Sequence, residues 1–278
     1  MAIDPKAVPA LKILAQIFAE ENRTFVLIGA TVSQIVVNIR QGGEFSARTT
    51  RDIDAVVEVA DWEDFEAMRQ RLFKVGFKPG SAPHELLFGP DVFFDLIPYG
   101  PGVVQNDHLE WPGTDRIMST FGMEEAFEYA EHATVASDLS VRVVPIPVLV
   151  LLKIISYTDR PEERARDLSD VVRYFEHYEE GDGESRRFEV GEVTVEARPV
   201  EFEEAGTYLL GIEVAELAKP KSLIPVRKFV TEFSDEYARP ILQVMREEGR
   251  ILNNERRRIE IFRLFKVFAA GLTEGAKS

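Results

Sequence analysis

The front half of the chain alternates between short apolar runs and longer amphipathic stretches. After Asp4-Pro5, apolar side chains recur at helical spacing, which predicts a helix over residues 5–21, and residues 31–40 return to the same spacing. Residues 24–28 between them are short, apolar and rich in β-branched side chains, which is typical of a buried strand. The alternation of helices and strands predicts an α/β fold for this half.

The rest of the front half continues the same alternation. The pattern predicts strands at residues 52–58, 85–88, 92–97 and 139–144. Asp61 is expected to cap a helix that Gly76 ends, and Gly89-Pro90 is expected to form the turn of a hairpin. Residues 103–118 have no clear period and are expected to be mostly loop.

The composition changes at Pro145-Ile146-Pro147. Beyond it the pattern predicts helices at residues 148–157, 164–178 and from 205 onward, with a polar linker at 181–185 and a small strand pair within 188–200. We therefore expect an α/β domain over residues 1–144, followed by a mostly helical domain over residues 145–278.

The chain has 278 residues, a hydrophobic fraction of 45% and no cysteine. This suits one large or two small globular domains, and it excludes disulfides and thiolate metal sites. The N-terminus lacks the basic and apolar segments of a signal peptide. The longest apolar run, Val143–Leu152, contains two prolines and is too short to span a bilayer. We expect a cytoplasmic protein without membrane contact.

The formal net charge of −15 argues against uniform coating of a nucleic-acid backbone, because that affinity comes mainly from Lys and Arg. The charge is uneven, since residues 241–278 hold eight Lys and Arg against five Asp and Glu. This basic stretch is either a solvated helix face or a contact for one local anionic partner.

Two carboxylates, Asp52 and Asp54, stand one residue apart in an alternating apolar strand. A strand has a period of two, so both leave one face, roughly 6–7 Å apart, and can lean together around a divalent cation. Such a pair suggests a Mg²⁺ site for a phosphate-bearing substrate. The alternative is that Asp52 simply caps a turn before the strand.

Two neighbouring motifs bear on the same chemistry. Gly29-Ala30-Thr31 lies between a strand and a helix, where glycine admits close backbone approach and the helix N-terminus attracts phosphate. The glycine can equally serve the shape of the turn alone. Arg48 or Arg51 could hold a triphosphate beside the metal, or could merely neutralise the aspartates.

Asp95 and Lys153 are charged residues in apolar surroundings. Asp95, inside an apolar strand, is expected to be paired, to bind metal or to act as a base, unless it is a partly exposed residue of an edge strand. Lys153, in an apolar helix, needs an anion. Asp167 and Asp170 share one face of the next predicted helix, so an interhelical salt bridge is the alternative to a phosphate ligand, which the motifs of the first half favour. The four histidines have no metal-ligand spacing.

Taken in order, these motifs resemble the nucleotidyltransferases of the DNA polymerase β superfamily. They are more similar to the AbiEii-type branch, often found as toxins of type IV toxin–antitoxin or abortive-infection systems. The matching segments are Ile28-Gly29-Ala30, Arg48-Thr49-x-x-Asp52-x-Asp54, Asp95, Lys153, Arg166-Asp167-Leu168-x-Asp170 and Ala205-Gly-Thr-Tyr-Leu-Leu-Gly211. The resemblance covers roughly residues 20–215, and the order and spacing of the motifs carry it.

The resemblance implies a nucleotidyltransferase-type mixed sheet flanked by helices, with a mostly helical C-terminal domain. It implies that Mg²⁺ (or Mn²⁺) binds an NTP at Asp52, Asp54 and Asp95, and that Asp95 can also deprotonate the attacking hydroxyl. The residues that would contact or support the nucleotide are Gly29, Ala30, Thr31, Arg48, Thr49, Lys153 and Asp167. The acceptor in this branch can be RNA, such as a tRNA end, and a cognate antitoxin is an expected partner.

The chain departs from the superfamily at Gly29-Ala30, where Gly-Gly or Gly-Ser is usual. The serine would contact phosphate, and Thr31 is the candidate substitute. Two rival functions follow. One is a small-molecule, antibiotic-type nucleotidyltransferase, which the acidic charge favours. The other is a catalytically silent binding module of the same fold, which the departure favours but the three retained carboxylates oppose.

Overall fold

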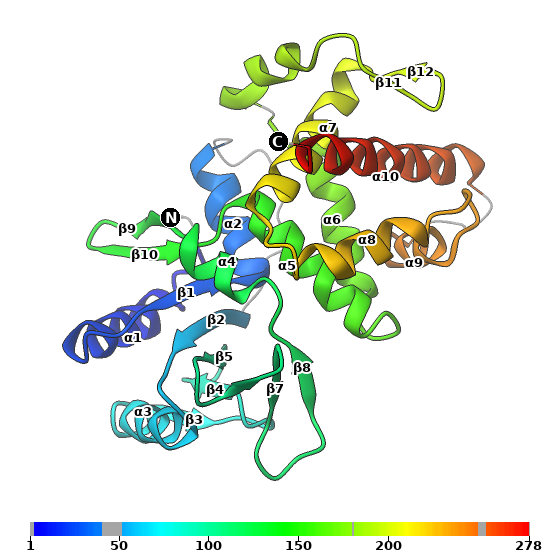
Figure 1. Cartoon of the computed structure of the whole chain (residues 1–278). Coiled ribbons are helices and arrows are strands. Elements are labelled where there is room, and N and C mark those ends of the chain that lie inside the picture. Colours follow the sequence, from blue (N-terminus) through cyan, green and yellow to red (C-terminus); the bar gives the residue numbers. More distant parts are fainter. Residues whose placement is uncertain (1–2, 41–51, 180, 250–253, 278) are drawn as a thin grey trace. The chain divides into compact units, whose positions relative to one another are not determined.

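The computed structural model describes residues 3–40, 52–179, 181–249 and 254–277 of the chain (Figure 1). They form two compact units, Met1–Pro145 and Ile146–Ser278, and each is described separately. Within the described ranges, no helix combines the length and apolar composition needed to cross a membrane.

The first unit is built on a seven-stranded sheet of order β3-β4-β5-β2-β1-β10-β9. Its strands are β1 (Phe25–Ile28), β2 (Asp52–Glu58), β3 (Phe77–Pro79), β4 (Glu85–Phe88), β5 (Val92–Tyr99), β9 (Glu131–Ala136) and β10 (Leu139–Val143). The β2–β5 and β1–β10 pairs are parallel and the others antiparallel, so the expected mixed sheet is confirmed.

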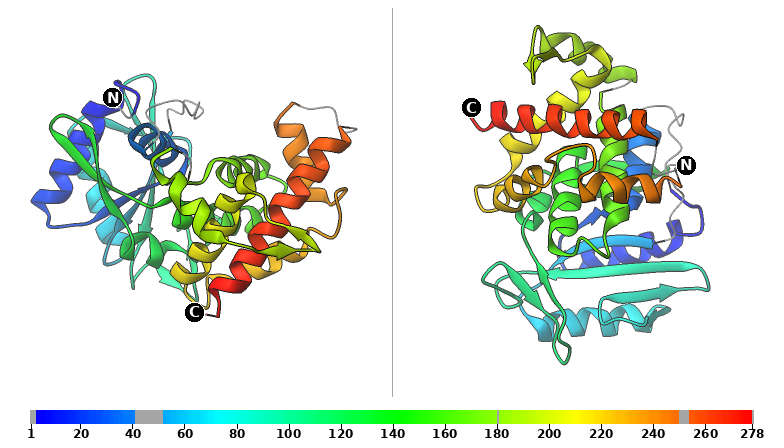
Figure 2. Two further views of the ribbon diagram at one scale, coloured as in Figure 1. Left: turned by 90° about the horizontal axis from the view of Figure 1, so that it is seen from above. Right: turned by 90° about the vertical axis from the view of Figure 1, so that its right-hand side faces the viewer.

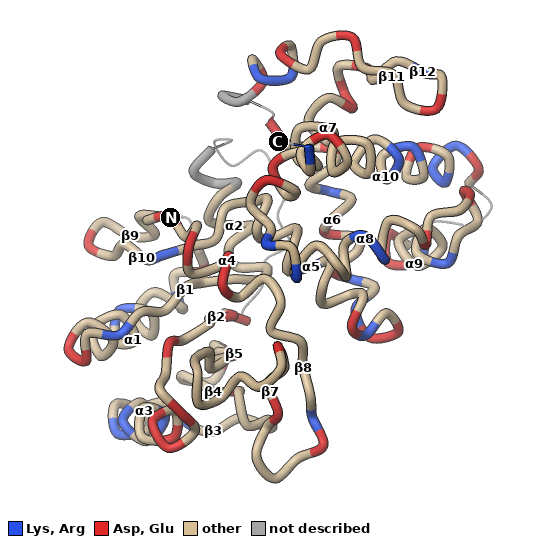
Figure 3. The backbone as a smooth tube through the Cα atoms, viewed as in Figure 1, with Lys and Arg blue, Asp and Glu red and all other residues tan. Residues whose placement is uncertain are grey.

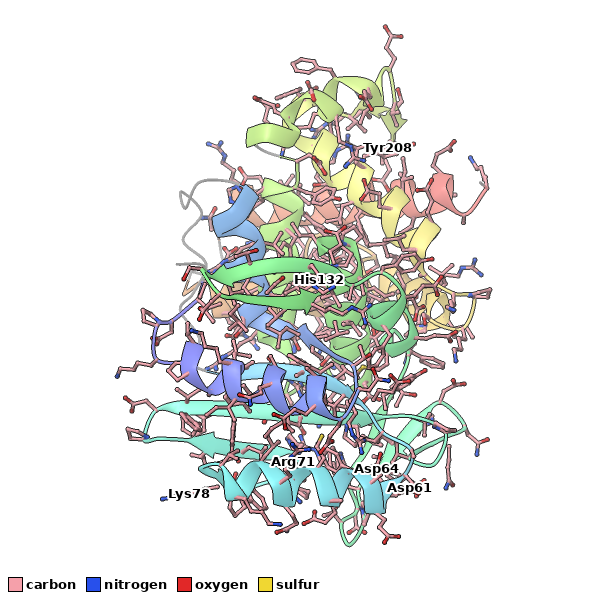
Figure 4. All side chains as sticks on the ribbon, turned by 90° about the vertical axis from the view of Figure 1, so that its left-hand side faces the viewer. Asp61, Asp64, Arg71, Lys78, His132 and Tyr208 are labelled. Carbon is pink, nitrogen blue, oxygen red and sulfur yellow. The ribbon has the colours of Figure 1, made fainter. Side chains whose placement is uncertain are left out.

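Four helices accompany this sheet: α1 (Val8–Glu20), α2 (Gly29–Arg40), α3 (Trp62–Lys74) and α4 (Met123–Glu128). Helices α1 and α3 are neighbours (Figure 4), and Arg71 of α3 forms ion pairs with Glu20 and Glu21 at the end of α1. The Asp61 carboxylate accepts the Asp64 N–H at 2.9 Å, which confirms the predicted N-cap of α3.

The first helix begins later than the Asp4-Pro5 pattern predicts. It starts at Val8, with Pro9 at its second position. Asp4 instead forms a turn, because its carboxylate accepts the Lys6 N–H at 2.9 Å and its carbonyl accepts the Ala7 N–H at 2.9 Å. An aspartate before a proline can close a turn as readily as it caps a helix.

The expectation of loop at residues 103–118 was wrong. This segment forms a three-stranded sheet of β6 (Val104–Gln105), β7 (His108–Glu110) and β8 (Ile117–Ser119). The strands have two or three residues, too few to produce a visible period. Trp111, which follows β7, is 2% exposed and packs its ring 5.4 Å from that of Trp62 in α3. Buried aromatic contact therefore fixes this small sheet.

The second unit is mostly helical, as expected. Its helices are α5 (Ile146–Asp159), α6 (Ala165–His177), α7 (Phe202–Leu217), α8 (Leu223–Thr231), α9 (Arg239–Glu247) and α10 (Glu255–Gly275). Helix α10 crosses α7 closely (Figure 2), and a Cβ atom at Gly271 would collide with the Tyr208 carbonyl oxygen.

Two expectations for the second unit need correction. Residues 181–185 were predicted to be a polar linker but begin a 3₁₀ helix, η1 (Gly181–Val190). The predicted strand pair within 188–200 is limited to β11 (Thr194–Val195) and β12 (Arg198–Pro199). The apparent alternation at its start belongs to η1, where Phe188 is exposed and its ring packs against Phe202.

Candidate active site

Two of the three candidate carboxylates stand directly opposite each other in the sheet. Strands β2 and β5 are parallel neighbours, and their register places Asp54 beside Asp95. Opposed residues of paired strands point to the same face, and so do residues two apart on one strand. Asp52, Asp54 and Asp95 therefore share one face of the first unit's sheet, as the alternation of β2 predicted for the first two.

The position of Asp95 excludes one of the interpretations left open by the sequence. Strand β5 lies between β4 and β2, so it is not an edge strand. The Asp95 side chain is nevertheless 36% exposed, because its face of β5 is only half-buried. The carboxylate is thus held on an inner strand while remaining accessible to solvent.

Asp52, Asp54 and Asp95 offer the donor atoms of a metal site. Oxygen donors are what Mg²⁺ and Mn²⁺ prefer, so the type of donor and the shared face both fit. In the arrangement seen here, however, no group of three or more His, Asp or Glu side chains among the described residues is placed to hold a metal ion. The donor atoms and the strands that carry them therefore suit a metal ion, but the three side chains do not converge on one point.

Gly29 brings the backbone against Asp54. Strand β1 ends at Ile28, which pairs with Asp54 across the sheet. Gly29 then opens α2 with φ of +73°, and a Cβ atom there would collide with the Asp54 carboxylate. Both the backbone conformation and the close approach require glycine. Gly29 and Ala30 are the first residues of α2, so the positive end of this helix lies beside Asp54.

The structure gives the Thr31 hydroxyl a different partner from the phosphate suggested by the sequence. Thr31 is 3% exposed, and its Oγ1 donates to the carbonyl oxygen of Asp52 at 2.8 Å. A hydroxyl has one proton to donate, so in this arrangement Thr31 cannot also donate to a phosphate. It ties α2 to the start of β2 instead. The other proposed contacts in this region, Arg48 and Thr49, lie outside the described residues, as does Arg51.

Lys153 forms an ion-pair cluster inside the second unit. Its Nζ, on α5, lies 2.8 Å from Asp170 Oδ2 and 3.1 Å from Asp167 Oδ1, both on α6. Burial acts to lower the pKa of the Lys153 ammonium, but the two carboxylates outweigh it and raise the pKa above its ordinary value. The interhelical salt bridge is therefore confirmed, and contact of Lys153 or Asp167 with a nucleotide stays a prediction.

Residues 12–249 match the family described as "Nucleotidyl transferase AbiEii toxin, Type IV TA system". The chain belongs to the AbiEii family. The matched range includes β1, α2, β2 and β5 around the carboxylates, and also α5 and α6 around Lys153. The reaction class of the family is nucleotidyl transfer. No curated protein matches the chain.

Among solved structures, the AbiEii-family chain is similar to an antigenic nucleotidyltransferase-like protein from Paracoccidioides brasiliensis. The identity is 16% and the TM-score 0.37, over 59% of this chain and 72% of that one. It is also similar to the CdnE cyclic dinucleotide synthase of Elizabethkingia meningoseptica, solved with GTP and Apcpp. There the identity is 12% and the TM-score 0.26, over 91% of this chain and 89% of that one.

Sequence reasoning missed His84, which adjoins Asp95 in this AbiEii-family chain. His84 Nε2 lies 3.9 Å from Asp95 Oδ2, and Arg116 Nη1 lies 3.4 Å from the same nitrogen. A signal was present, because counting back from the predicted Gly89-Pro90 turn places Glu85 opposite Asp95. The contact with Arg116 had no signal, since Arg116 lies in the turn between β7 and β8, within the segment that was expected to be loop.

The basic C-terminal stretch is largely engaged within the second unit. Arg257 on α10 forms ion pairs with Glu176 and Glu248, Arg263 lies 3.0 Å from Glu204, and Lys266 lies 3.3 Å from Glu196. Figure 3 shows Lys and Arg in blue along α10. These cations are paired with carboxylates of the same unit, which favours a structural role over a contact for an anionic partner.

Proposed function

We propose that this chain transfers the nucleotidyl group of an NTP to the hydroxyl of an acceptor molecule. The proposed site of this reaction is formed by Asp52, Asp54 and Asp95. The observation that carries the proposal is the in-register pair of Asp54 and Asp95, with the Gly29 backbone packed against Asp54. Membership of the AbiEii family supports the reaction class. Two like charges directly opposite each other on neighbouring strands disfavour folding, which is expected where function requires them.

The reaction is an in-line displacement at the α-phosphorus. The acceptor oxygen forms a bond to this phosphorus, the bond to the β-phosphate bridging oxygen breaks, and pyrophosphate leaves. Asp95 accepts the proton of the acceptor hydroxyl, and its partial exposure makes it accessible for this role. Bound at Asp52, Asp54 and Asp95, Mg²⁺ or Mn²⁺ would supply the positive charge that offsets charge on the triphosphate.

Backbone N–H groups at the start of α2 are the proposed contacts for phosphate oxygens. Gly29 and Ala30 occupy this position, and the first N–H groups of a helix have no partner within the helix. Arg48 and Thr49 are proposed as further nucleotide contacts on the basis of the family motif. Thr31 is proposed only as the residue that holds Asp52 in place, through its 2.8 Å hydrogen bond.

Lys153 and Asp167 are proposed as a second nucleotide-contacting group. An ammonium has three N–H donors, and Asp167 and Asp170 take two of those on Lys153. A phosphate oxygen would take the third. Asp167 would then support the site by fixing the position of Lys153.

The proposed acceptor is the terminal hydroxyl of an RNA, and the proposed partner is a cognate antitoxin. The toxin–antitoxin description of the family supports the antitoxin partner. The RNA acceptor is proposed from the resemblance of the sequence motifs to the AbiEii-type branch. A net charge of −15 favours a local contact with an RNA end over binding along an RNA backbone. We propose that the reaction takes place in the cytoplasm, where NTP and RNA are both present.

The proposal is tested by label transfer. Purified protein is incubated with Mg²⁺ and each of four α-³²P-labelled NTPs, with total RNA in one set and a small-molecule extract in another. The wild-type protein is expected to label RNA, and the Asp54→Ala variant is expected to label nothing. Asp91→Asn is the matched control, because Asp91 lies in the β4–β5 turn and pairs with Lys6 at 2.8 Å. Label on a small molecule would instead support the antibiotic-type enzyme, and no transfer despite NTP binding would support the silent module.

A further inference from the structure

His84 is held beside Asp95 by the backbone. The Leu96 N–H, next to Asp95 on β5, donates to the His84 carbonyl oxygen at 2.9 Å. The imidazole is 12% exposed, and its Nε2 lies 3.9 Å from Asp95 Oδ2. The main-chain bond thus fixes the Cα of His84 relative to the carboxylate that the proposed reaction uses as a base.

The hairpin formed by β7 and β8 contacts the His84 ring on two sides. The ring of Trp111 packs 5.3 Å from the imidazole at 44° between the ring planes, and Arg116 Nη1 lies 3.4 Å from Nε2. Trp111 and Arg116 face each other across this hairpin, where the Trp111 N–H donates to the Arg116 carbonyl oxygen at 3.1 Å. The backbone N–H of Arg116 donates to Thr114 Oγ1 at 3.2 Å.

The hairpin is itself anchored in the core of the first unit. Trp111 is 2% exposed, and its ring packs 5.4 Å from Trp62 and 6.0 Å from Phe65 of α3. An aromatic ring in such a cluster has little freedom to reorient. Through Trp111, the packing of α3 therefore reaches the imidazole beside Asp95.

We infer that His84 is a positioning residue for Asp95, and that Arg116 acts through it. This inference rests on the proposed function. The imidazole stands beside Oδ2 and limits rotation of the carboxylate, while Arg116 Nη1 donates a hydrogen bond to its Nε2 at 3.4 Å. Loss of a group that orients a metal ligand typically costs about 10- to 100-fold in metal affinity or activity.

Conservative variants separate positioning from packing. His84→Phe keeps an aromatic ring against Trp111 but removes the nitrogen that faces Asp95 and Arg116. His84→Gln retains a polar group near the position of Nε2 but loses the ring. Arg116→Met removes the guanidinium. His132→Phe is the control, because His132 is an exposed residue of β9 (Figure 4).

The measurements are kcat and KM for NTP, the Kd of Mn²⁺ by electron paramagnetic resonance, and the melting temperature. Relative to the wild type, His84→Phe is expected to lower kcat and weaken Mn²⁺ binding by about 10- to 100-fold, the range seen when groups that orient metal ligands are removed. KM for NTP and the melting temperature should stay near wild type. His84→Gln should recover most of kcat, and His84→Phe combined with Arg116→Met should lose no more than His84→Phe alone.

Other outcomes overturn the inference in distinguishable ways. If His84→Phe matches the wild type in kcat and Mn²⁺ binding while the wild type transfers label, the inference alone fails. If both His84 variants are equally weak and melt early, the residue serves packing and the inference fails. If the wild type neither transfers label nor binds Mn²⁺, the proposed function fails and Asp95 has no role to be positioned for.

Discussion

At Gly29 the chain turns from β1 into α2 with φ of +73°, directly against the Asp54 carboxylate. Gly29→Ala is expected to abolish nucleotidyl transfer, because the added methyl group must displace Asp54. It should also destabilise the protein by about 1–2 kcal/mol through the left-handed backbone alone. Thermal denaturation and label transfer measure the two effects.

Gly89→Ala separates these effects. Gly89 has φ of +65° in the β4–β5 turn, and a Cβ there would meet nothing within 4 Å. This variant should share the loss of stability but keep the activity of the wild type. Equal activity of the two variants would show that the approach of Gly29 to Asp54 has no functional meaning.

The residues of the candidate site differ in how far the sequence reveals them. Asp52 and Asp54 follow from period two on one strand, and the turn at Gly29 follows from a glycine between strand and helix. The partner of Thr31 does not, because its hydrogen bond to Asp52 joins residues that lie 21 positions apart. His84 becomes a neighbour of Asp95 only through the register of β4 and β5. Local pattern identifies candidate groups, and strand pairing decides which of them meet.

At the scale of the helices, the cluster of Lys153, Asp167 and Asp170 joins α5 to α6. Lys153→Met is expected to cost about 3–5 kcal/mol of stability, because it leaves two partly buried carboxylates without their buried cation. Combining it with Asp167→Asn and Asp170→Asn should restore most of this loss. Urea denaturation of the single and the triple variant measures the loss of stability and its recovery.

The same triple variant tests whether Lys153 contacts the nucleotide. It removes the ion pairs without leaving an uncompensated charge, so a purely structural cluster would let activity return together with stability. Contact with the triphosphate predicts that the triple variant folds well but transfers no label. Full activity in this variant would limit Lys153 to holding the two helices together.

A buried hydrogen bond joins α5 to α9. Tyr157 Oη donates to Gln243 Oε1 at 2.8 Å, and burial, followed by the charge of Glu232, raises the pKa of Tyr157 from 10.0 to about 12. Between these two pH values the folded state keeps a proton that the unfolded chain releases. Stability should therefore fall as the pH rises from about 10 to 12.

The stability of the Tyr157→Phe variant should fall less steeply over this pH window than that of the wild type. At neutral pH it should be less stable by about 1–3 kcal/mol, because Gln243 loses the donor to its buried oxygen. Urea denaturation from pH 8 to pH 12 gives both quantities. Identical pH slopes for the two proteins would contradict the raised pKa of Tyr157.

The elements that the sequence predicted well are those with a strong local signal. Strand β2 and the strand pair around Gly89-Pro90 appear where alternation and turn residues placed them. The small sheet of β6, β7 and β8 was missed because its strands of two or three residues have no measurable period. It is stabilised by Trp111 packing on α3, a contact between distant parts of the sequence that local pattern does not contain.

Across the whole molecule, the chain carries a net charge of −15 while the described cations of its basic C-terminal stretch are largely paired with carboxylates. Composition alone suggested a positive surface there. The structure shows instead that arginine and lysine of this stretch offset glutamates contributed by α6, α7 and the segments around α9 and β11. A charge count along the sequence does not indicate which charges remain available to a partner.

The central claim, nucleotidyl transfer at Asp52, Asp54 and Asp95, is tested most directly by asking which phosphate of the NTP reaches the product. The wild type is incubated with Mg²⁺, total RNA and an NTP labelled at either the α- or the γ-phosphate, beside Asp54→Asn and the matched control Asp91→Asn. The account predicts that α-label enters RNA, that γ-label is released as pyrophosphate, and that only Asp54→Asn abolishes both. Transfer of γ-label to the product, or unchanged α-transfer by Asp54→Asn, would contradict it.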